Sequence, residues 1–279
     1  MKRLKNWLRR LIEIIRKPEI GILPGQMSFF LVLSAIPIIT LLIYAASLFA
    51  FDIEDILEAF SSFLPQNLLN MLSHYLSNNN LTVGMGLTLL FAFTLASNGP
   101  YSMIVASNTL YKVEKSDYIR GRLKAFLMTI LLVSLFVFTL VFLAFGNSIL
   151  SMLFKIGFFK QFESGFLIVY NIIKWPISMF IIFLAVKLLY TMAPDKEIKS
   201  KYVNKGAIFT TTSWMLIANI YSFYAMNFSR YDAIYGNLST IVTLMMVIYI
   251  FSYLFVIGIA INASFYQYKE EIEDHNNNG

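Results

Sequence analysis

Six long runs of apolar residues dominate the chain, and short polar segments separate them. The runs cover approximately 27–50, 81–110, 123–145, 166–190, 206–228 and 238–262, and none contains Asp or Glu. Each is long enough for an α-helix to cross the hydrocarbon core of a bilayer, which takes about 20 residues. Strands of a membrane barrel would alternate in polarity, whereas 127–145 is apolar on nearly every face. We therefore predict an all-α, polytopic membrane protein with a bundle of six transmembrane helices.

Amphipathic segments outside these runs predict short helices that lie at the membrane interface. Residues 1–26 hold apolar side chains at helical spacing opposite a basic face, which predicts a helix on the cytoplasmic surface. The outer loop 51–80 has no Lys or Arg and carries one apolar stripe on each side of Pro65, so we expect two short helices there. The whole chain, 1–279, is expected to be one membrane domain, with a transmembrane region over 27–262 and a frayed acidic cytoplasmic tail over 263–279.

The composition excludes an ordinary soluble protein. Hydrophobic residues make up 58% of the chain and charged residues 14%, about half the charged share of a typical soluble domain. Mean hydropathy is +0.66. The chain has no cysteine, which excludes disulfides, thiolate nucleophiles and thiolate-bound metals.

The positive charges predict the orientation of the helices. Seventeen of the 22 Lys and Arg residues precede the first run, follow the second or fourth, or lie in the C-terminal tail. Cytoplasmic loops collect such residues. We therefore expect a multi-pass protein of the inner, cytoplasmic cell membrane with both termini in the cytoplasm.

Two Ser-x-x-Pro sequences interrupt the first and second runs at similar depth. The first is Ser34 with Pro37, and the second is Ser97, Asn98, Gly99 and Pro100. Proline removes a backbone donor, so we expect both helices to break near the membrane midplane and to expose polar groups there. Thr211 and Asn219 of the fifth run are further candidates for this polar layer, which is either a substrate cavity or a set of contacts between helices.

Three basic residues are candidate contacts for anionic lipid headgroups: Lys174, Arg120 and Arg122. A charge at the bilayer centre costs several kcal/mol, about 2.5–3.5 on insertion scales. Two interpretations of Lys174 therefore stay open. Either the fourth helix starts later, with Lys174 at the outer interface and Pro176 in the first helical turn, or the ammonium faces a cavity and binds a headgroup.

The order and spacing of several further residues resemble a known family over nearly the whole chain. They are Asn108-x-x-Tyr111, Tyr190-x-x-x-Pro194, Gly206 with Trp214 and Tyr224, Tyr235-Gly236 and Gly258-x-x-x-Asn262, together with Ser34-x-x-Pro37. This pattern resembles the YihY/virulence factor BrkB family of bacterial inner-membrane proteins. The resemblance implies a six-helix membrane protein, and some relatives are connected with the movement of lipid-linked envelope material or with serum resistance.

Three functions are compared on this basis. The first is a transporter or flippase-like protein for an amphipathic, anionic envelope lipid or lipid-linked precursor. The second is a non-transporting scaffold or assembly partner in envelope biogenesis. The third is an enzyme, including the ribonuclease that the family was once labelled, and it is disfavoured because the apolar runs lack the carboxylates and histidines that such chemistry needs.

These comparisons lead to a set of expectations about ligands. We expect no enzyme activity, no cofactor, no metal and no nucleic acid as partner. The expected partners are membrane lipids with anionic headgroups, and further candidates are a second copy of the chain or an envelope-biogenesis protein. The sequence leaves open the substrate, the direction and energy source of transport, and the oligomeric state.

Overall fold

The computed structural model describes residues 9, 11–47, 70, 84–114, 117–144, 163–227 and 237–277, and every regular element among them is helical. In chain order the elements are α2 (Pro18–Ser47), α5 (Gly84–Ala96), α6 (Asn98–Tyr111), α7 (Tyr118–Ala144), α9 (Glu163–Met192), the 3-10 helix η2 (Ser200–Tyr202), α10 (Asn204–Asn227) and α12 (Asn237–Asn277). Each predicted run coincides with one helix, except that the second is divided into α5 and α6. The predicted all-α fold is confirmed, and the six membrane crossings stay a prediction.

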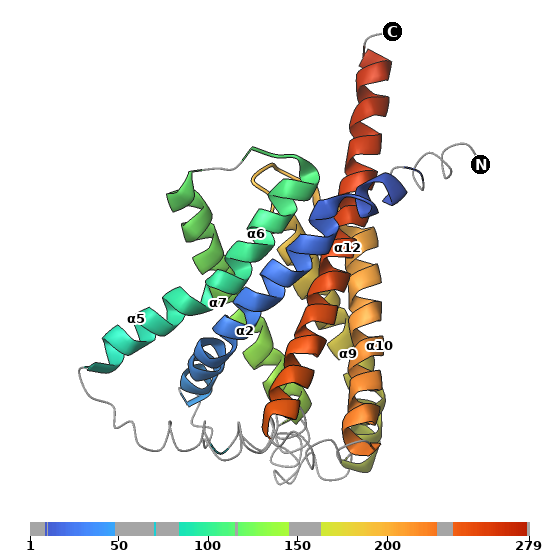
Figure 1. Cartoon of the computed structure of the whole chain (residues 1–279). Helices are drawn as coiled ribbons and strands as arrows, with labels where there is room; N and C mark the ends of the chain where they lie inside the picture. The colour runs from blue at the N-terminus through green and yellow to red at the C-terminus, as the bar shows by residue number, and fades with distance from the viewer. Residues whose placement is uncertain are drawn as a thin grey trace.

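The long helices pack into a closed series of neighbours. Helix α2 contacts α12, which contacts α10, and the series continues through α9, α7 and α6 back to α2. The connections α6 to α7 and α9 to α10 lie at the end of the bundle where α2 begins and where α12 leaves (Figure 1). We call this the basic end, and it consists of residues 11–18, 109–114, 117–124 and 192–206. Helix α5 diverges from the bundle at the opposite end (Figure 1).

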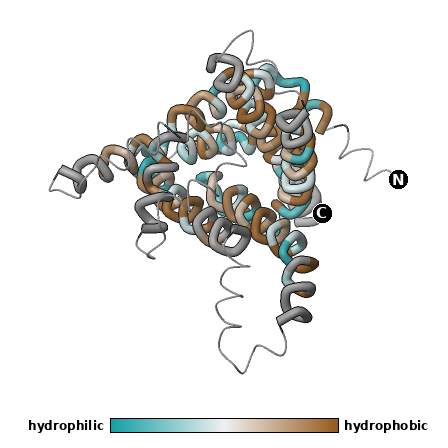
Figure 2. Tube along the Cα trace, turned by 90° about the horizontal axis from the view of Figure 1, so that it is seen from below, coloured by the Kyte–Doolittle hydropathy of each residue, from teal (hydrophilic) through white to brown (hydrophobic). Residues whose placement is uncertain are grey.

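The outside of the bundle is apolar as well as its core. Met27, Met128 and Phe255 are fully buried, whereas Phe91 and Trp175 are 68% and 62% exposed. Viewed along the bundle, apolar positions run along the outer sides of the helices (Figure 2). This distribution is that of a protein whose surface faces lipid, since water disfavours large exposed apolar areas.

Two helices among the described residues are long and apolar enough to cross a membrane. They span Ile172–Met192 and Val242–Tyr268, with mean hydropathies of 2.0 and 2.5. Only 22% and 33% of their most apolar windows are buried. A core helix of a soluble protein would instead be mostly buried, so the exposure favours contact with lipid.

Two helix ends differ from the expected segment boundaries. The amphipathic segment was expected to continue to residue 26, but α2 already begins at Pro18, after a turn at Arg16 and Lys17. Proline suits the first position of a helix because its missing N–H is not needed there. The expected frayed tail from 263 onward is instead a continuation of α12 to Asn277. The polar residues of the tail end the apolar run, but they do not end the helix.

Two expectations about prolines are also corrected. The structure keeps α2 as one helix through Pro37, so a break occurs only in the second run. Pro176 lies inside α9, which begins at Glu163, and not in a first helical turn. The two expected helices of the outer loop 51–80 lie outside the described residues, apart from Asn70.

Candidate functional site

The break between α5 and α6 is held by a hydroxyl from another helix. In an uninterrupted helix the Gly99 amide would donate to the Leu95 carbonyl oxygen, four residues earlier. Here the Ser34 hydroxyl of α2 lies between them. It donates to the Leu95 carbonyl oxygen at 3.1 Å and accepts from the Gly99 amide at 3.2 Å. A side chain inserted into the helical ladder is one of the known causes of a kink.

Pro100 and Gly99 explain why the break occurs at this point. Pro100 has no N–H to donate to the Ala96 carbonyl oxygen, so the ladder is interrupted in the same turn. A Cβ atom at Gly99 would lie 2.9 Å from Leu31 Cδ2 and 3.6 Å from Ser34 Oγ. Glycine therefore lets α2 approach closely enough for Ser34 to reach both backbone groups.

Arg122 of α7 holds the other side of the break. Its Nη1 donates to Asn98 Oδ1 at 2.9 Å, and its Nη2 donates to the Thr94 carbonyl oxygen at 3.0 Å. The guanidinium carbon also lies 5.7 Å from the ring centroid of Tyr101 and 5.6 Å from that of Phe126. Among the described residues Arg122 thus uses two of its five N–H donors, and an anionic group could accept from the others.

The break lies beside the first turns of α7. The ring of Tyr101 contacts that of Tyr118, with centroids 6.1 Å apart, and Phe93 contacts Phe126 at 5.4 Å. Since α7 starts at Tyr118, these contacts place the break closer to the basic end than the midplane layer predicted from sequence.

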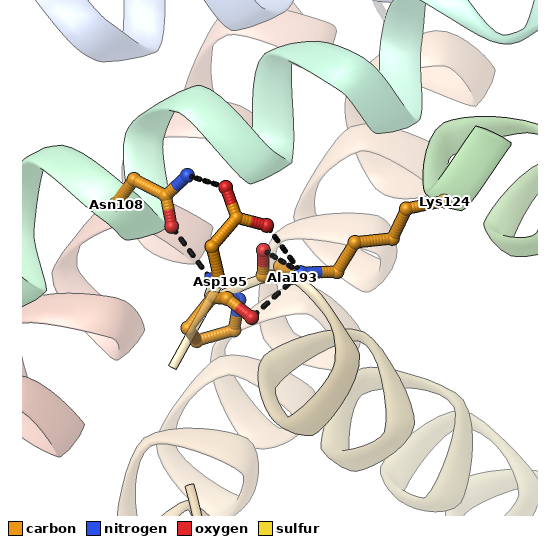
Figure 3. Close-up of polar contacts among 5 residues, drawn as sticks. Asn108, Lys124, Ala193 and Asp195 are labelled. Carbon is orange, nitrogen blue, oxygen red and sulfur yellow. Dashed lines mark hydrogen bonds and ion pairs between the residues drawn. The ribbon is translucent and has the colours of Figure 1, made fainter. Parts of the chain in front are cut away.

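A second polar cluster connects three helices at the basic end (Figure 3). The Asn108 side chain of α6 donates from Nδ2 to Asp195 Oδ2 at 2.6 Å and accepts from the Asp195 amide at 2.8 Å. Lys124 of α7 donates to Asp195 Oδ1 at 2.8 Å and to the carbonyl oxygens of Ala193 and Pro194. The cluster therefore joins α6 and α7 to the residues that follow α9.

A third polar contact is fully buried between α9, α10 and α12. The Tyr190 hydroxyl donates to the Phe255 carbonyl oxygen at 2.8 Å and lies 2.6 Å from Thr210 Oγ1. A Cβ atom at Gly258 would collide with both hydroxyl groups. Because residue 258 is a glycine, the hydroxyl groups of Tyr190 and Thr210 have room to meet beside its backbone.

Asn262 and Trp214 fix the remainder of this interface. The Gly206 amide, in the first turn of α10, donates to Asn262 Oδ1 at 2.7 Å. It is one of the amides that have no acceptor within their own helix. A Cβ atom at Gly206 would collide with the Gly258 carbonyl oxygen and the Asn262 amide group. The Trp214 indole donates to the Phe251 carbonyl oxygen at 3.0 Å.

Tyr111 is the last residue of α6, and its side chain packs against α12. It is 7% exposed, and its ring centroid lies 5.9 Å from that of Tyr266. Burial raises the pKa of the Tyr111 hydroxyl, and the neighbouring Tyr266 adds to this effect. Within the described part of the chain the hydroxyl has no hydrogen-bond partner.

The structure brings some predicted residues together and leaves others apart. Ser34, Ser97, Asn98 and Pro100 meet at the break with Arg122, as described above. Asn219 does not join them, because it is exposed and donates to the Met215 carbonyl oxygen of its own helix.

Four other predicted positions are not among the residues that hold the break. Thr211 is 1% exposed, Arg120 is exposed in the first turn of α7, and Lys174 is half-buried near the start of the apolar stretch Ile172–Met192. Pro37 is half-buried in α2, one helical turn after Ser34. Tyr235 and Gly236 lie outside the described residues, and only the backbone of Tyr224 is described, in α10.

Sequence reasoning missed Asp195 and Lys124. Asp195 stands directly after Pro194 in a loop, where an acid is normally solvated, and Lys124 counted only toward the basic loop. The sequence did contain a usable signal, because Asp195 follows Pro194 at the end of a predicted helix. The last carbonyl groups of a helix attract a cation, and an acid beside them adds to that attraction.

The chain matches known proteins over most of its length. Residues 16–279 match the family described as virulence factor BrkB. The chain is 27% identical over 256 residues to the ribonuclease-like protein YfkH of Bacillus subtilis. The aligned region covers 90% of this chain and 92% of that protein. No solved structure shows significant similarity to it.

Two further relatives carry the name UPF0761 membrane protein. One, from Aeromonas salmonicida, is 24% identical over 260 residues, covering 90% of this chain and 85% of the relative. The other, from Idiomarina loihiensis, is 28% identical over 112 residues, covering 40% of this chain and 38% of the relative. Because the family match extends over nearly the whole chain, this protein belongs to the virulence factor BrkB family of membrane proteins.

Proposed function

We propose that this protein moves an amphipathic, anionic envelope lipid or lipid-linked precursor across the cytoplasmic membrane, with both termini in the cytoplasm. The observation that supports it most is the helix break at Ser97, whose backbone is held by Ser34 from α2 and by Arg122 from α7. Broken helices at membrane depth occur where backbone groups are buried in protein or line a cavity, and transporters use them as substrate sites.

The charges around the break favour an anionic substrate. Arg122 presents a guanidinium between two aromatic rings, and a guanidinium matches the geometry of a phosphate oxygen pair. Arg120 is exposed on the preceding half-turn of the same helix, where a headgroup would reach it. Lys174 lies on α9, far along the bundle from these residues, and would meet a headgroup at the opposite membrane surface.

A scaffold without transport is the second candidate, because the polar groups at the break are already paired with one another. In that function the Ser34 and Arg122 contacts would fix the helix positions, and a second copy of the chain or an envelope-biogenesis protein would bind outside. The ribonuclease-like name of the Bacillus relative is not extended to this chain. Metal-dependent cleavage needs clustered acids or histidines, and the described residues hold no group of three or more.

A lipid translocation assay separates the two candidates. Proteoliposomes would carry a fluorescent phosphatidylglycerol or phosphatidylcholine, and dithionite would quench the label in the outer leaflet. We expect the native protein to expose the anionic lipid faster than the zwitterionic one, and the S34A and R122Q variants to be slower. The exposed Arg16 at the basic end supplies a matched charge control, R16Q.

Each outcome of this assay favours transport, favours the scaffold, or reveals an effect of net charge. Folded native protein that leaves every anionic label protected would contradict the transport proposal. If S34A and R122Q also kept full function in cells, the scaffold would be favoured. Loss of transport in R16Q equal to that in R122Q would show that net charge, and not the break, is what the assay detects.

A further inference from the structure

The ammonium group of Lys124 is held in a set of oxygen atoms at the C-terminal end of α9. Its Nζ lies 3.0 Å from the Ala193 carbonyl oxygen, 2.6 Å from that of Pro194 and 2.8 Å from Asp195 Oδ1. The Ala193 amide still donates to the Leu189 carbonyl oxygen, so these carbonyl groups belong to the helix end. That end carries partial negative charge, which favours a cation. All three ammonium donors have an acceptor.

Asp195 is held independently of Lys124. Its second oxygen accepts from Asn108 Nδ2, and its amide donates to Asn108 Oδ1, so the Asn108 side chain clamps it at two points. The Asp195 side chain is 9% exposed and that of Lys124 is 23% exposed. Water therefore reaches the lysine more easily than the aspartate, and the lysine is the partner able to leave.

A contact of this kind adds little net stability but resists the loss of one partner. Replacement of a buried ion pair by apolar residues is often neutral, whereas removal of one partner leaves an uncompensated charge. Release of Lys124 therefore needs another anion to accept its charge. Asp195 would keep both bonds to Asn108 after release and would not be left without partners.

The headgroup of an anionic lipid is an anion that could accept the charge of Lys124 at its position on α7. Lys124 lies two residues after Arg122 on α7, so the two cations point to different sides of that helix. Arg122 contacts the break in α5 and α6, and Lys124 contacts the end of α9. Both lie in the first two turns of α7 at the basic end, at the level expected for lipid headgroups.

We infer that Lys124 is exchanged between Asp195 and the headgroup of an anionic lipid, and that this exchange releases the residues after α9 from α7 and opens the basic end. The inference rests on the proposed function and adds a gate to it. A ligand shifts two states only through contacts that differ between them. The anionic headgroup meets this condition because it pairs with Lys124 only after the ammonium has left Asp195.

The absence of cysteine from the chain allows a direct test with one introduced thiol. Ser107 is next to Asn108, is 1% exposed, and its hydroxyl has no hydrogen-bond partner among the described residues, so Ser107→Cys changes little. The rate of its reaction with a neutral methanethiosulfonate reports opening. The protein would be held in nanodiscs of phosphatidylglycerol or phosphatidylcholine.

We expect faster labelling of S107C in phosphatidylglycerol, by about fivefold or more, because the anionic lipid releases Lys124. K124M should label rapidly in both lipids and lose the difference between them. D195N, which keeps an amide for Asn108 and puts folding least at risk, should raise the rate in both lipids by about tenfold. R16Q should keep the native lipid dependence.

Equal labelling of the S107C protein in the two lipids would overturn the inference, and so would D195N labelling at the rate of S107C alone. The labelling measurement does not depend on transport. Lipid-dependent labelling without translocation would contradict the transport proposal and leave the gate intact. Translocation with lipid-independent labelling would contradict the gate and leave transport intact.

Discussion

The close contact at Gly258 predicts how much stability one added methyl group removes. Gly258→Ala places a Cβ atom against the hydroxyl groups of Tyr190 and Thr210, and 2.9 Å from Tyr190 Cζ. Tyr190 is 1% exposed, and its ring centroid lies 4.6 Å from that of Phe255. The tyrosine is therefore packed on all sides and has no space into which to withdraw.

The expected loss of stability is the sum of opposing terms. Overpacking costs about 1–3 kcal/mol. A displaced Tyr190 hydroxyl also loses its bond to the Phe255 carbonyl oxygen, which adds about 1 kcal/mol. Alanine is a better helix former than glycine by about 1 kcal/mol. We therefore expect Gly258→Ala to lower the free energy of unfolding by about 1–3 kcal/mol.

The chain offers a matched control for the helix term. A Cβ atom at Gly25 of α2 would meet no heavy atom within 4 Å, so Gly25→Ala should gain helix propensity without a collision. The two alanine variants should differ by about 2–4 kcal/mol. Titration with sodium dodecyl sulfate in detergent micelles, followed by circular dichroism, measures the difference.

A double variant tests the cause. Tyr190→Phe removes one of the two hydroxyl groups that the new methyl meets, so Gly258→Ala should cost less in that background, by about 1 kcal/mol. The reasoning is refuted if Gly258→Ala is as stable as Gly25→Ala. It is also refuted if the cost of Gly258→Ala is the same with and without the Tyr190 hydroxyl.

Three further predictions concern the polar contacts. Ser34→Ala should lower the free energy of unfolding by only about 1 kcal/mol, because the Gly99 amide then donates directly to the Leu95 carbonyl oxygen. Spin labels on either side of the break should show a straighter helix in this variant. Asn262→Ala should cost about 1 kcal/mol in the same unfolding assay, since the Gly206 amide loses its acceptor. Arg122→Lys should reduce transport of the anionic lipid more than its stability, because an ammonium lacks the planar fork; the translocation assay measures this.

The positions of the helices could be predicted from the sequence because hydropathy is a sum over neighbouring residues. Every apolar run overlaps helical sequence in the structure, and the Ser97-x-x-Pro100 sequence marks the place where the second run is divided into α5 and α6. The ends were less well predicted. Hydropathy marks the residues that suit lipid, whereas α2 and α12 continue into polar sequence at Pro18 and up to Asn277.

Which polar residues meet was decided by the rotation of each helix. Thr210 and Asn219 are both polar residues of α10, but they are nine residues apart. At 3.6 residues per turn this is two and a half turns, which places them on opposite faces. Thr210 contacts Tyr190, and Asn219 is exposed.

The amino-acid sequence is enough to identify a helical membrane protein, its family and the place where one helix is interrupted. The tertiary structure alone decided that Ser34 enters that break and that Lys124, Asp195 and Asn108 form one cluster. The physical reason is the separation along the sequence over which each interaction acts. Apolar burial and the missing N–H of proline act within one segment, whereas these hydrogen bonds join residues more than sixty positions apart and exist only once the helices have packed.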